Sequence, residues 1–181
     1  MREIAKFKKI SGQQLEEDAE LFLGGIITPD DLAIQYDMVY KMLANTPLPK
    51  RATKGSAGYD IYSPVSRKVK AGEPFIIPTG LRCLMNDKCF LMIVPRSGLG
   101  FKYGLRLVNT SAIIDADFAN ADNEGHILLK FVADKDFEIH AGDRIAQGIF
   151  LKYGITVDDE ADGERHGGFG STDEVKKDEQ V

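Results

Sequence analysis

The sequence is poor in the residues that mark several specialised protein classes. It has two cysteines, three histidines and no tryptophan among 181 residues. Two cysteines cannot build the disulfide framework of a small secreted domain, and no cysteine or histidine spacing fits a zinc site. We therefore interpret Cys83 and Cys89 as small buried thiols, and His126, His140 and His166 as surface or loop residues.

Long apolar runs and an excess of basic residues are also missing. No stretch approaches the roughly 20 apolar residues of a membrane-spanning helix, and the opening MREIAKFKKISGQQ lacks the apolar core of a secretory signal. We expect a cytoplasmic protein that makes no membrane contact. The 23 basic and 28 acidic side chains give a net charge of −5, which argues against nucleic-acid binding because a phosphate backbone needs a basic face. A small anionic ligand needs only a few cations and stays compatible.

The first 46 residues carry a helical pattern. With 43% hydrophobic and 28% charged residues, the chain can form one globular domain with an appendage. Apolar residues recur at helical spacing over residues 15–23 and 32–43, on either side of the glycine pair at 24–25. Thr28-Pro29 is typical of a helix start. Residues 1–46 thus predict a helical hairpin extension that caps the main domain. A surface for a protein partner or another subunit is the alternative.

Residues 47–160 have a different sequence pattern. Short runs rich in Val, Ile and Phe alternate with Gly, Pro, Asp and Asn about every eight to twelve residues. A short helical turn is expected only after Gly98. Many short strands with turns between them predict an all-β fold, a jelly-roll-like barrel or sandwich. Residues 161–181 are rich in glycine and charge without apolar periodicity, which predicts a flexible C-terminal arm.

Five short segments turn this β core into a specific hypothesis. They are AGYDI (57–61), PRSG (95–98), NTSAIIDADF (109–118), GDRIAQ (142–147) and RHGGFGST (165–172). In order and spacing they resemble the five motifs of the trimeric all-β dUTP diphosphatases (dUTPases), over residues 48–172. The resemblance implies a dUTPase-type jelly roll and a homotrimer with active sites at subunit interfaces. It also implies Mg²⁺-dependent hydrolysis of dUTP to dUMP and pyrophosphate, which limits uracil incorporation into DNA and supplies dUMP for thymidylate synthesis.

Two of these segments carry the groups expected at the phosphates. Arg96, Ser97 and Gly98 offer a guanidinium, a hydroxyl and an open backbone N–H, which suits either a phosphate site or a surface turn with one ion pair. Asp115 follows two β-branched residues and either caps a turn, the commoner case, or orients a water. The resemblance implies that the first three residues grip the triphosphate and that Asp115 is the catalytic residue that activates water. An aspartate is a weak base, so its value lies mainly in placing that water.

The third segment is implied to bind the base and sugar. Asn109, Ile114 and Gly125 are expected to shape a narrow hairpin pocket for uracil, which excludes thymine by its methyl group and cytosine by its donor pattern. Phe118 stands where the family usually has a tyrosine that packs on the deoxyribose. The sequence departs from the family at Ala112, usually glycine, and in the lengthened path at residues 119–124 before Gly125. We interpret the extra residues as a hairpin insertion that alters the pocket rim.

Magnesium and the arm complete the expected site. Mg²⁺ keeps several waters and is often held by substrate phosphates, so the resemblance implies that Asp60 and Gln147 contact it through water. Alone, these two residues would be interpreted as a turn cap and a strand-edge amide. Arg144 is expected to form an inter-strand or subunit ion pair. The arm is implied to close over the nucleotide, with substrate-binding residues Arg165, Phe169, Gly170, Ser171 and Thr172.

Two other functions stay open from the residues. A dCTP deaminase-like enzyme on the same fold would place a glutamate near the position of Asp115, and ammonia release would reveal it. A regulatory dUTP-binding protein would keep the nucleotide site but act through a protein partner, with the N-terminal helices as its candidate surface. Such a protein would keep its biological effect after loss of pyrophosphate release.

Overall fold

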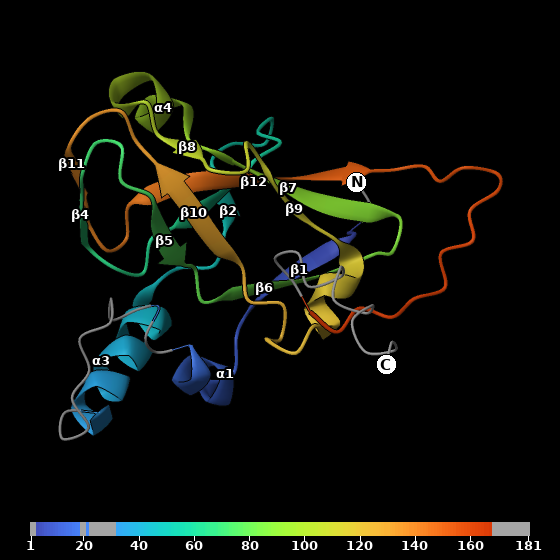
Figure 1. The fold of residues 1–181 in the computed structure, drawn as a ribbon, viewed down its shortest axis with the longest axis horizontal. Coiled ribbons are helices and arrows are strands. Elements are labelled where there is room, and N and C mark those ends of the chain that lie inside the picture. The colour runs from blue at the N-terminus through green and yellow to red at the C-terminus, as the bar shows by residue number, and fades with distance from the viewer. Residues whose placement is uncertain (1–2, 19–20, 22–31, 168–181) are drawn as a thin grey trace, which may run out of the picture.

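The computed structural model describes residues 3–18, 21 and 32–167, and the fold over this part of the chain is mostly β (Figure 1). Helices are few and short, as expected for an all-β protein. The strands are β1 (Ala5–Lys9), β2 (Lys50–Arg51), β3 (Tyr59–Tyr62), β4 (Arg67–Val69), β5 (Phe75–Pro78), β6 (Leu81–Met85), β7 (Cys89–Pro95), β8 (Arg106–Leu107), β9 (Ala112–Ile114), β10 (Leu128–Val132), β11 (Phe137–Ile139) and β12 (Arg144–Lys152). The helices are α1 (Gly12–Glu17), α3 (Leu32–Asn45), α4 (Ser97–Tyr103) and the 3-10 helix η2 (Ala116–Asn120).

The largest sheet has the order β2-β3-β12-β7-β9. Its central strand β12 pairs antiparallel with β3 on one side and β7 on the other, so that Gln147 lies opposite both Asp60 and Val94. On the far side of β7, β9 pairs through Ile113 with Met92. The register therefore decides which motif residues are neighbours: the first and fourth motifs meet across β3 and β12, while the third lies beyond β7.

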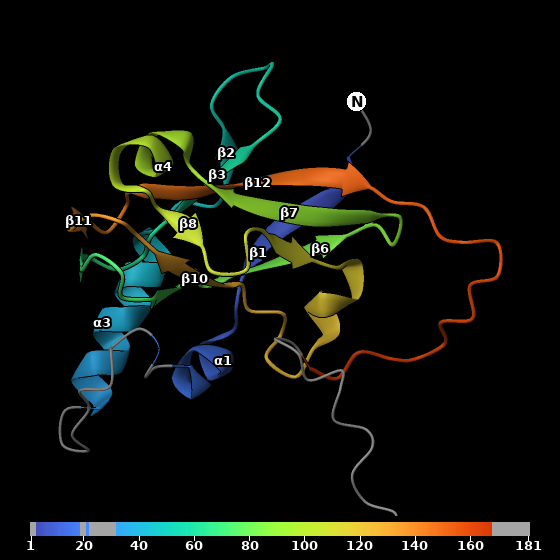
Figure 2. The same cartoon turned by 45° about the horizontal axis from the view of Figure 1, so that its top comes forward.

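A second layer completes a jelly-roll-like sandwich, in agreement with the predicted fold class (Figure 2). It contains the sheet β5-β10-β8 and the antiparallel pairs β1–β6 and β4–β11. Apolar side chains from both layers fill the space between them, and Ile61, Leu91, Ile93, Leu129 and Phe131 are fully buried. Each such side chain contributes about 1.5–3 kcal/mol by leaving water.

The N-terminal segment differs from the predicted helical hairpin. Residues Ala5–Lys9 form strand β1, which pairs with β6 and places Phe7 opposite Cys83. The helices follow as an insertion between β1 and β2, at one end of the sandwich (Figures 1 and 2). The predicted second helix is confirmed as α3, whose Leu43 packs on Gly80 so closely that a Cβ there would lie 2.1 Å from the leucine. The predicted Thr28 helix start and the glycine pair at 24–25 lie outside the described residues.

Several single-residue expectations can be checked against the fold. Cys83 and Cys89 are free and buried, as predicted, and burial raises the pKa of the Cys83 thiol to about 12. The surface interpretation of His126 is wrong: it is fully buried, with Nε2 accepting from the Gly80 N–H at 3.0 Å. His140 and His166 are exposed, as expected. Among the described residues, no helix is long and apolar enough to cross a membrane.

Candidate active site

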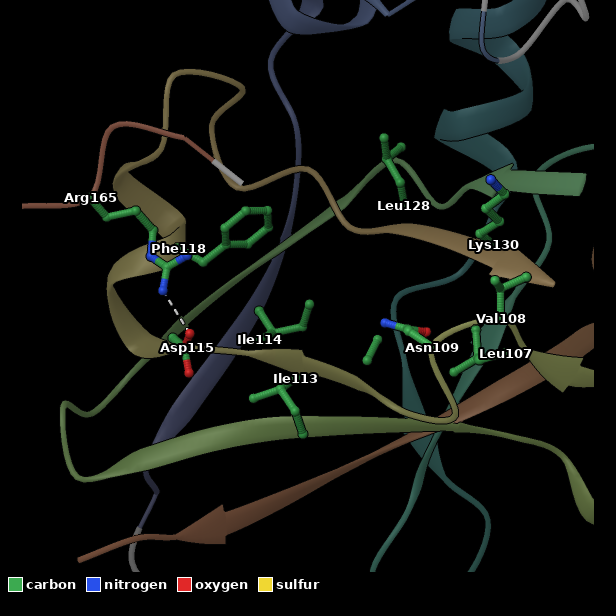
Figure 3. Close-up of a pocket in the computed structure, with 11 residues that line it drawn as sticks. Leu107, Val108, Asn109, Ile113, Ile114, Asp115, Phe118, Leu128, Lys130 and Arg165 are labelled. Carbon is green, nitrogen blue, oxygen red and sulfur yellow. Dashed lines mark hydrogen bonds and ion pairs between the residues drawn. The ribbon is translucent and has the colours of Figure 1, made fainter. Parts of the chain in front are cut away.

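A pocket of about 410 Å³ opens beside the β8–β9 hairpin and η2 (Figure 3). The hairpin is tight: Leu107 bridges to Thr110, which adopts a positive φ of 69°. This turn brings backbone groups to the pocket edge. The pocket is lined by Leu107, Val108, Asn109, Ala112, Ile113, Ile114, Asp115, Phe118, Leu128, Lys130 and Arg165. Four predicted site residues of the third motif thus share one hollow with Arg165 of the arm.

Asp115 occupies the junction between β9 and η2. It stands at the N-cap position of η2, yet its side chain makes no capping hydrogen bond. The carboxylate is 49% exposed and accepts from Arg165 Nη2 at 2.7 Å. The turn-cap interpretation therefore does not describe this residue. Its carboxylate is presented outward, at the rim of the pocket.

Arg165 holds three groups of the same loop. Its Nε donates to Asp117 Oδ1 at 2.9 Å, and its guanidinium carbon lies 6.0 Å from the centroid of the Phe118 ring. Phe118 is buried, with 6% of its surface exposed. The chain after β12 makes a wide excursion and returns beside η2 (Figures 1 and 2), which brings Arg165 there. In this structure Arg165 neutralises two carboxylates, one of which is the predicted catalytic group.

A second cluster forms where β3, β7 and β12 run side by side. Asp60 is nearly buried, with its side chain 12% exposed, and its two oxygens each face an arginine: Arg96 Nε at 3.4 Å and Arg144 Nη1 at 3.2 Å. The Arg96 N–H donates to Ile145 O at 3.1 Å, so the backbone anchors this arginine. The predicted inter-strand ion pair of Arg144 is confirmed. A second pocket of about 410 Å³ adjoins this cluster and includes Arg96, Gly98, Lys102 and Arg144.

Gln147 lies next to Asp60 because the two are paired across the strands. A Cβ on Gly58 would lie 2.5 Å from Gln147 Oε1, so glycine is needed there for the amide to keep its place. Within the described ranges, no group of three or more His, Cys, Asp or Glu residues could hold a metal ion. One carboxylate and one neighbouring amide oxygen suit a Mg²⁺ ion that is held by phosphates and touches the protein through water.

The predicted site residues thus fall into two groups that line separate pockets. Asn109, Ile114, Asp115, Phe118 and Arg165 line the first, whereas Arg96 and Gly98 line the second and Ser97 is exposed beside it. Gly125 lines neither pocket. The predicted contacts of Phe169, Gly170, Ser171 and Thr172 lie outside the described residues.

Sequence reasoning missed part of the first pocket. Lys130 and Leu128 line it from β10, where Lys130 is exposed between buried Leu129 and Phe131. The sequence did hold one sign of this: Lys130 is a single lysine inside an otherwise apolar strand. Because successive residues of a strand face opposite sides, this lysine had to point away from the core.

Comparison with known proteins gives one consistent result. The dUTPase family model matches residues 44–173. A deoxyuridine 5'-triphosphate nucleotidohydrolase of Lactococcus lactis is 40% identical over 134 residues, 71% of this chain and 89% of that protein. A dUTPase from Streptococcus mutans superposes with a TM-score of 0.55 at 35% identity, over 60% of this chain and 88% of that one. A mutant dUTPase from phage phi11 of S. aureus, described with a structural Mg(II) ion, superposes with a TM-score of 0.55 at 18% identity, over 66% and 92% of the two chains.

Proposed function

The chain belongs to the dUTPase family, and from this premise we propose that it hydrolyses dUTP to dUMP and pyrophosphate, with Asp115 directing the attacking water. The observation that carries the mechanism is the shared pocket of Asn109, Asp115, Phe118 and Arg165. It sets a carboxylate at the rim of a mainly apolar hollow that has the dimensions of a small ligand.

Asp115 has the geometry that water activation requires. Its side chain is half-exposed and is not used to cap η2. In our proposal it accepts a hydrogen bond from a water and aligns that water with the α-phosphorus, so that its main contribution is orientation. When the triphosphate binds, Arg165 leaves the carboxylate for the phosphate oxygens, where its fork can form paired hydrogen bonds.

The hairpin and η2 provide the base and sugar contacts. Ile114 and the backbone around Asn109 shape the uracil end of the pocket, and Phe118 packs against the deoxyribose. Because Phe118 is buried in a fixed position, a 2′-hydroxyl would meet the ring edge and be disfavoured. We expect this contact to favour a deoxynucleotide without a tyrosine hydroxyl.

The second cluster is the proposed triphosphate end. Arg96, Ser97 and Gly98 present a guanidinium, a hydroxyl and an open N–H, and Asp60 fixes the direction of Arg96 through its 3.4 Å contact. Asp60 and Gln147 would hold Mg²⁺ through water molecules. Bound to the phosphates, Mg²⁺ supplies neutralisation of their negative charge.

We propose a homotrimer with active sites at the subunit interfaces, and the separation of the two pockets supports a site shared between subunits. Asp115 and Arg96 must act on one nucleotide, yet within one protomer they line different hollows. We propose that a second copy brings its Arg96 cluster to the Asp115 pocket of the first, and that residues 161–181 close over the site while residues 47–160 form the core. Exposed apolar side chains near both clusters, Phe101 at 94% and Ile113 at 50%, support burial against another subunit.

A nucleotide panel tests the reaction. Purified protein with Mg²⁺ should release pyrophosphate from dUTP and much less from dCTP, dTTP or UTP. Ammonia release from dCTP would instead indicate a deaminase, and pyrophosphate release from all four nucleotides would refute the pocket assignment.

Mixing two inactive variants tests the shared site. Asp115→Asn and Arg96→Ala should each be inactive alone. If each site takes the two residues from different subunits, mixed trimers recover part of the activity because some sites contain both intact groups. Absence of recovery, with subunit exchange shown by light scattering and mass labelling, would place both residues in one protomer's site.

A further inference from the structure

The insertion after Phe118 is joined to the N-terminal helical segment, and both lie outside the five motifs. Glu124 Oε2 accepts from the Ser11 N–H at 2.9 Å and lies 3.4 Å from Arg82 Nη1. Arg82 Nη2 also donates to the carbonyl of Ala119, the residue after Phe118. One arginine from β6 therefore connects the end of the pocket loop to the start of α1.

The hydrogen bond from the Ser11 N–H to Glu124 takes the place of one that Gln14 could form within the same helix. Ser11 caps α1 by accepting from the Gln14 N–H at 3.0 Å, and a serine followed three residues later by Gln usually forms a reciprocal pair. Here the Gln14 side chain turns instead to Asp18, with Nε2 3.0 Å from Oδ2. The Ser11 N–H is left for Glu124. Hydrogen bonding by Ser11, mainly from its side chain and to a smaller extent from this N–H, lowers the pKa of Glu124.

The other end of α1 is held by His126. Because His126 Nε2 accepts from the Gly80 N–H, its proton resides on Nδ1, which lies 2.6 Å from Asp18 Oδ2. Burial acts to raise the pKa of Asp18, but hydrogen bonds from His126 and Gln14 outweigh it and lower the pKa. Residues 124 and 126 thus clamp both ends of α1 with groups that are ionised or fully buried.

The loop that follows Phe118 also packs against the backbone of Phe118 and contacts the C-terminal arm. Gly125 has a φ of +71°, and a Cβ there would lie 2.4 Å from the carbonyl oxygen of Phe118. The loop therefore packs directly on the backbone that carries the Phe118 ring. In addition, the Asp122 N–H donates to His166 O at 3.1 Å, next to Arg165.

We propose that Arg82 is a positioning residue for nucleotide selection. With Glu124 it braces η2 against β6 and α1, and so fixes the depth at which the Phe118 ring meets the sugar. This inference rests on the proposed role of Phe118. It gives the helical segment between β1 and β2 a function in nucleotide selection, because this segment supports the loop that carries the Phe118 ring.

The Arg82→Met variant tests the brace, since methionine keeps much of the apolar stem and loses the donors. We expect the KM for dUTP to rise and the preference for dUTP over UTP to fall, each by about tenfold, with kcat within about twofold. Arg82→Lys keeps one cationic donor and should recover part of the preference.

Arg106→Met is the matched control. Arg106 likewise donates to one carboxylate and one backbone carbonyl, those of Asp134 and Gly104, outside the pocket lining. It should leave the ratio of dUTP to UTP turnover unchanged. A purely structural role for Arg82 would lower the unfolding temperature without moving that ratio, and this result would overturn the proposal.

Two further variants keep the outcomes separate. If Arg82→Met does not fold, Glu124→Gln decides, because it keeps an acceptor for Ser11 and loses the ion pair; an unchanged dUTP to UTP ratio then overturns the brace. Phe118→Ala tests the premise. If Phe118→Ala alters the ratio and the Arg82 and Glu124 variants do not, the brace fails while the proposed function stands. If Phe118→Ala has no effect, the role of Phe118 in the proposed function fails as well.

Discussion

The two halves of the candidate site are built in different ways. At the Asp60 cluster, strand register and a backbone hydrogen bond hold a nearly buried carboxylate between two arginines. At the Asp115 pocket, a half-exposed carboxylate meets an arginine that is 50 residues away in the chain, in the segment after the last strand. The first half is therefore preorganised by the sheet, while the second is completed by the arm.

The two halves are therefore suited to different tasks, one to binding the phosphates and the other to the chemical step. A group fixed by the sheet can hold phosphates at constant geometry, and its loss costs stability as well as affinity. A carboxylate whose partner comes from the arm can exchange that partner for water and substrate. We therefore expect substitutions in the Asp115 half to act mainly on turnover, and those in the Asp60 half to act on phosphate binding and on stability.

The largest effect is expected from Asp115→Asn. The amide has no charge and only one acceptor oxygen, so it orients the attacking water poorly, and kcat should fall by roughly 10³-fold or more, with dUTP affinity largely retained. Single-turnover pyrophosphate release and calorimetric titration with a non-hydrolysable analogue measure the two quantities. Asp117→Asn is the matched control, since it removes the other carboxylate bound to Arg165, and its loss of kcat should be far smaller. A near-normal rate for Asp115→Asn would remove this residue from the mechanism.

Truncation after Gly163 should have the second-largest effect. It removes Arg165 and the glycine-rich segment, and kcat/KM should drop by roughly 100-fold, because water exclusion and part of the cation set are lost. Chromatography and thermal unfolding should show an intact fold and assembly. Truncation after Asp173 removes only the charged end and serves as control. Equal activity of the two truncated proteins would contradict closure by the arm.

Much of the fold and of the Asp115 pocket could be predicted from the sequence, because local sequence patterns determine these features. The short apolar runs between turn residues predicted the strands. A helical turn was expected after Gly98, and α4 begins at Ser97, one residue before it. The pocket residues Asn109, Ile114, Asp115 and Phe118 lie within one ten-residue motif, so a single hairpin brings them together. Strand β1 was not predicted. It has only two apolar residues at alternate positions, Ala5 and Phe7, and its other three residues are lysines, so the two-residue period of a strand was too short to recognise.

Long-range contacts could not be predicted in the same way. The pairs Arg165–Asp115 and His126–Asp18 join residues 50 and 108 positions apart. Neither pair produces a periodic pattern or a characteristic spacing in the sequence. A single histidine before an apolar strand does not indicate that its ring contacts a backbone N–H and a carboxylate in the fold. The separation of Asp115 from Arg96 is also a consequence of strand order, which no single motif encodes.

A smaller effect, on stability, is expected from Asp60→Asn. Removing this carboxylate leaves Arg96 and Arg144 without their shared partner, although both arginines are partly exposed and solvent screens them. Unfolding free energy should fall by about 1–2 kcal/mol, or roughly 3–6 °C in melting temperature. Asp134→Asn breaks an exposed pair with Arg106 and should cost less than about 0.5 kcal/mol. Equal melting temperatures for the two variants would show that the sheet does not depend on Asp60.

The smallest effect is expected from Phe118→Tyr, which places a hydroxyl at the tip of a ring that is 6% exposed and lies beneath Arg165. If the ring selects the sugar by contact, the added group should change the preference for dUTP over UTP by roughly three- to tenfold. The ring itself stays in place, so kcat for dUTP should change little. Competition between the two nucleotides in one reaction measures the ratio directly, with Phe90→Tyr on β7, a partly exposed ring outside the pocket lining, as the control for an added phenol. An unaltered ratio in Phe118→Tyr would mean that the sugar is read elsewhere, and the pocket half would then supply the catalytic carboxylate without the selectivity.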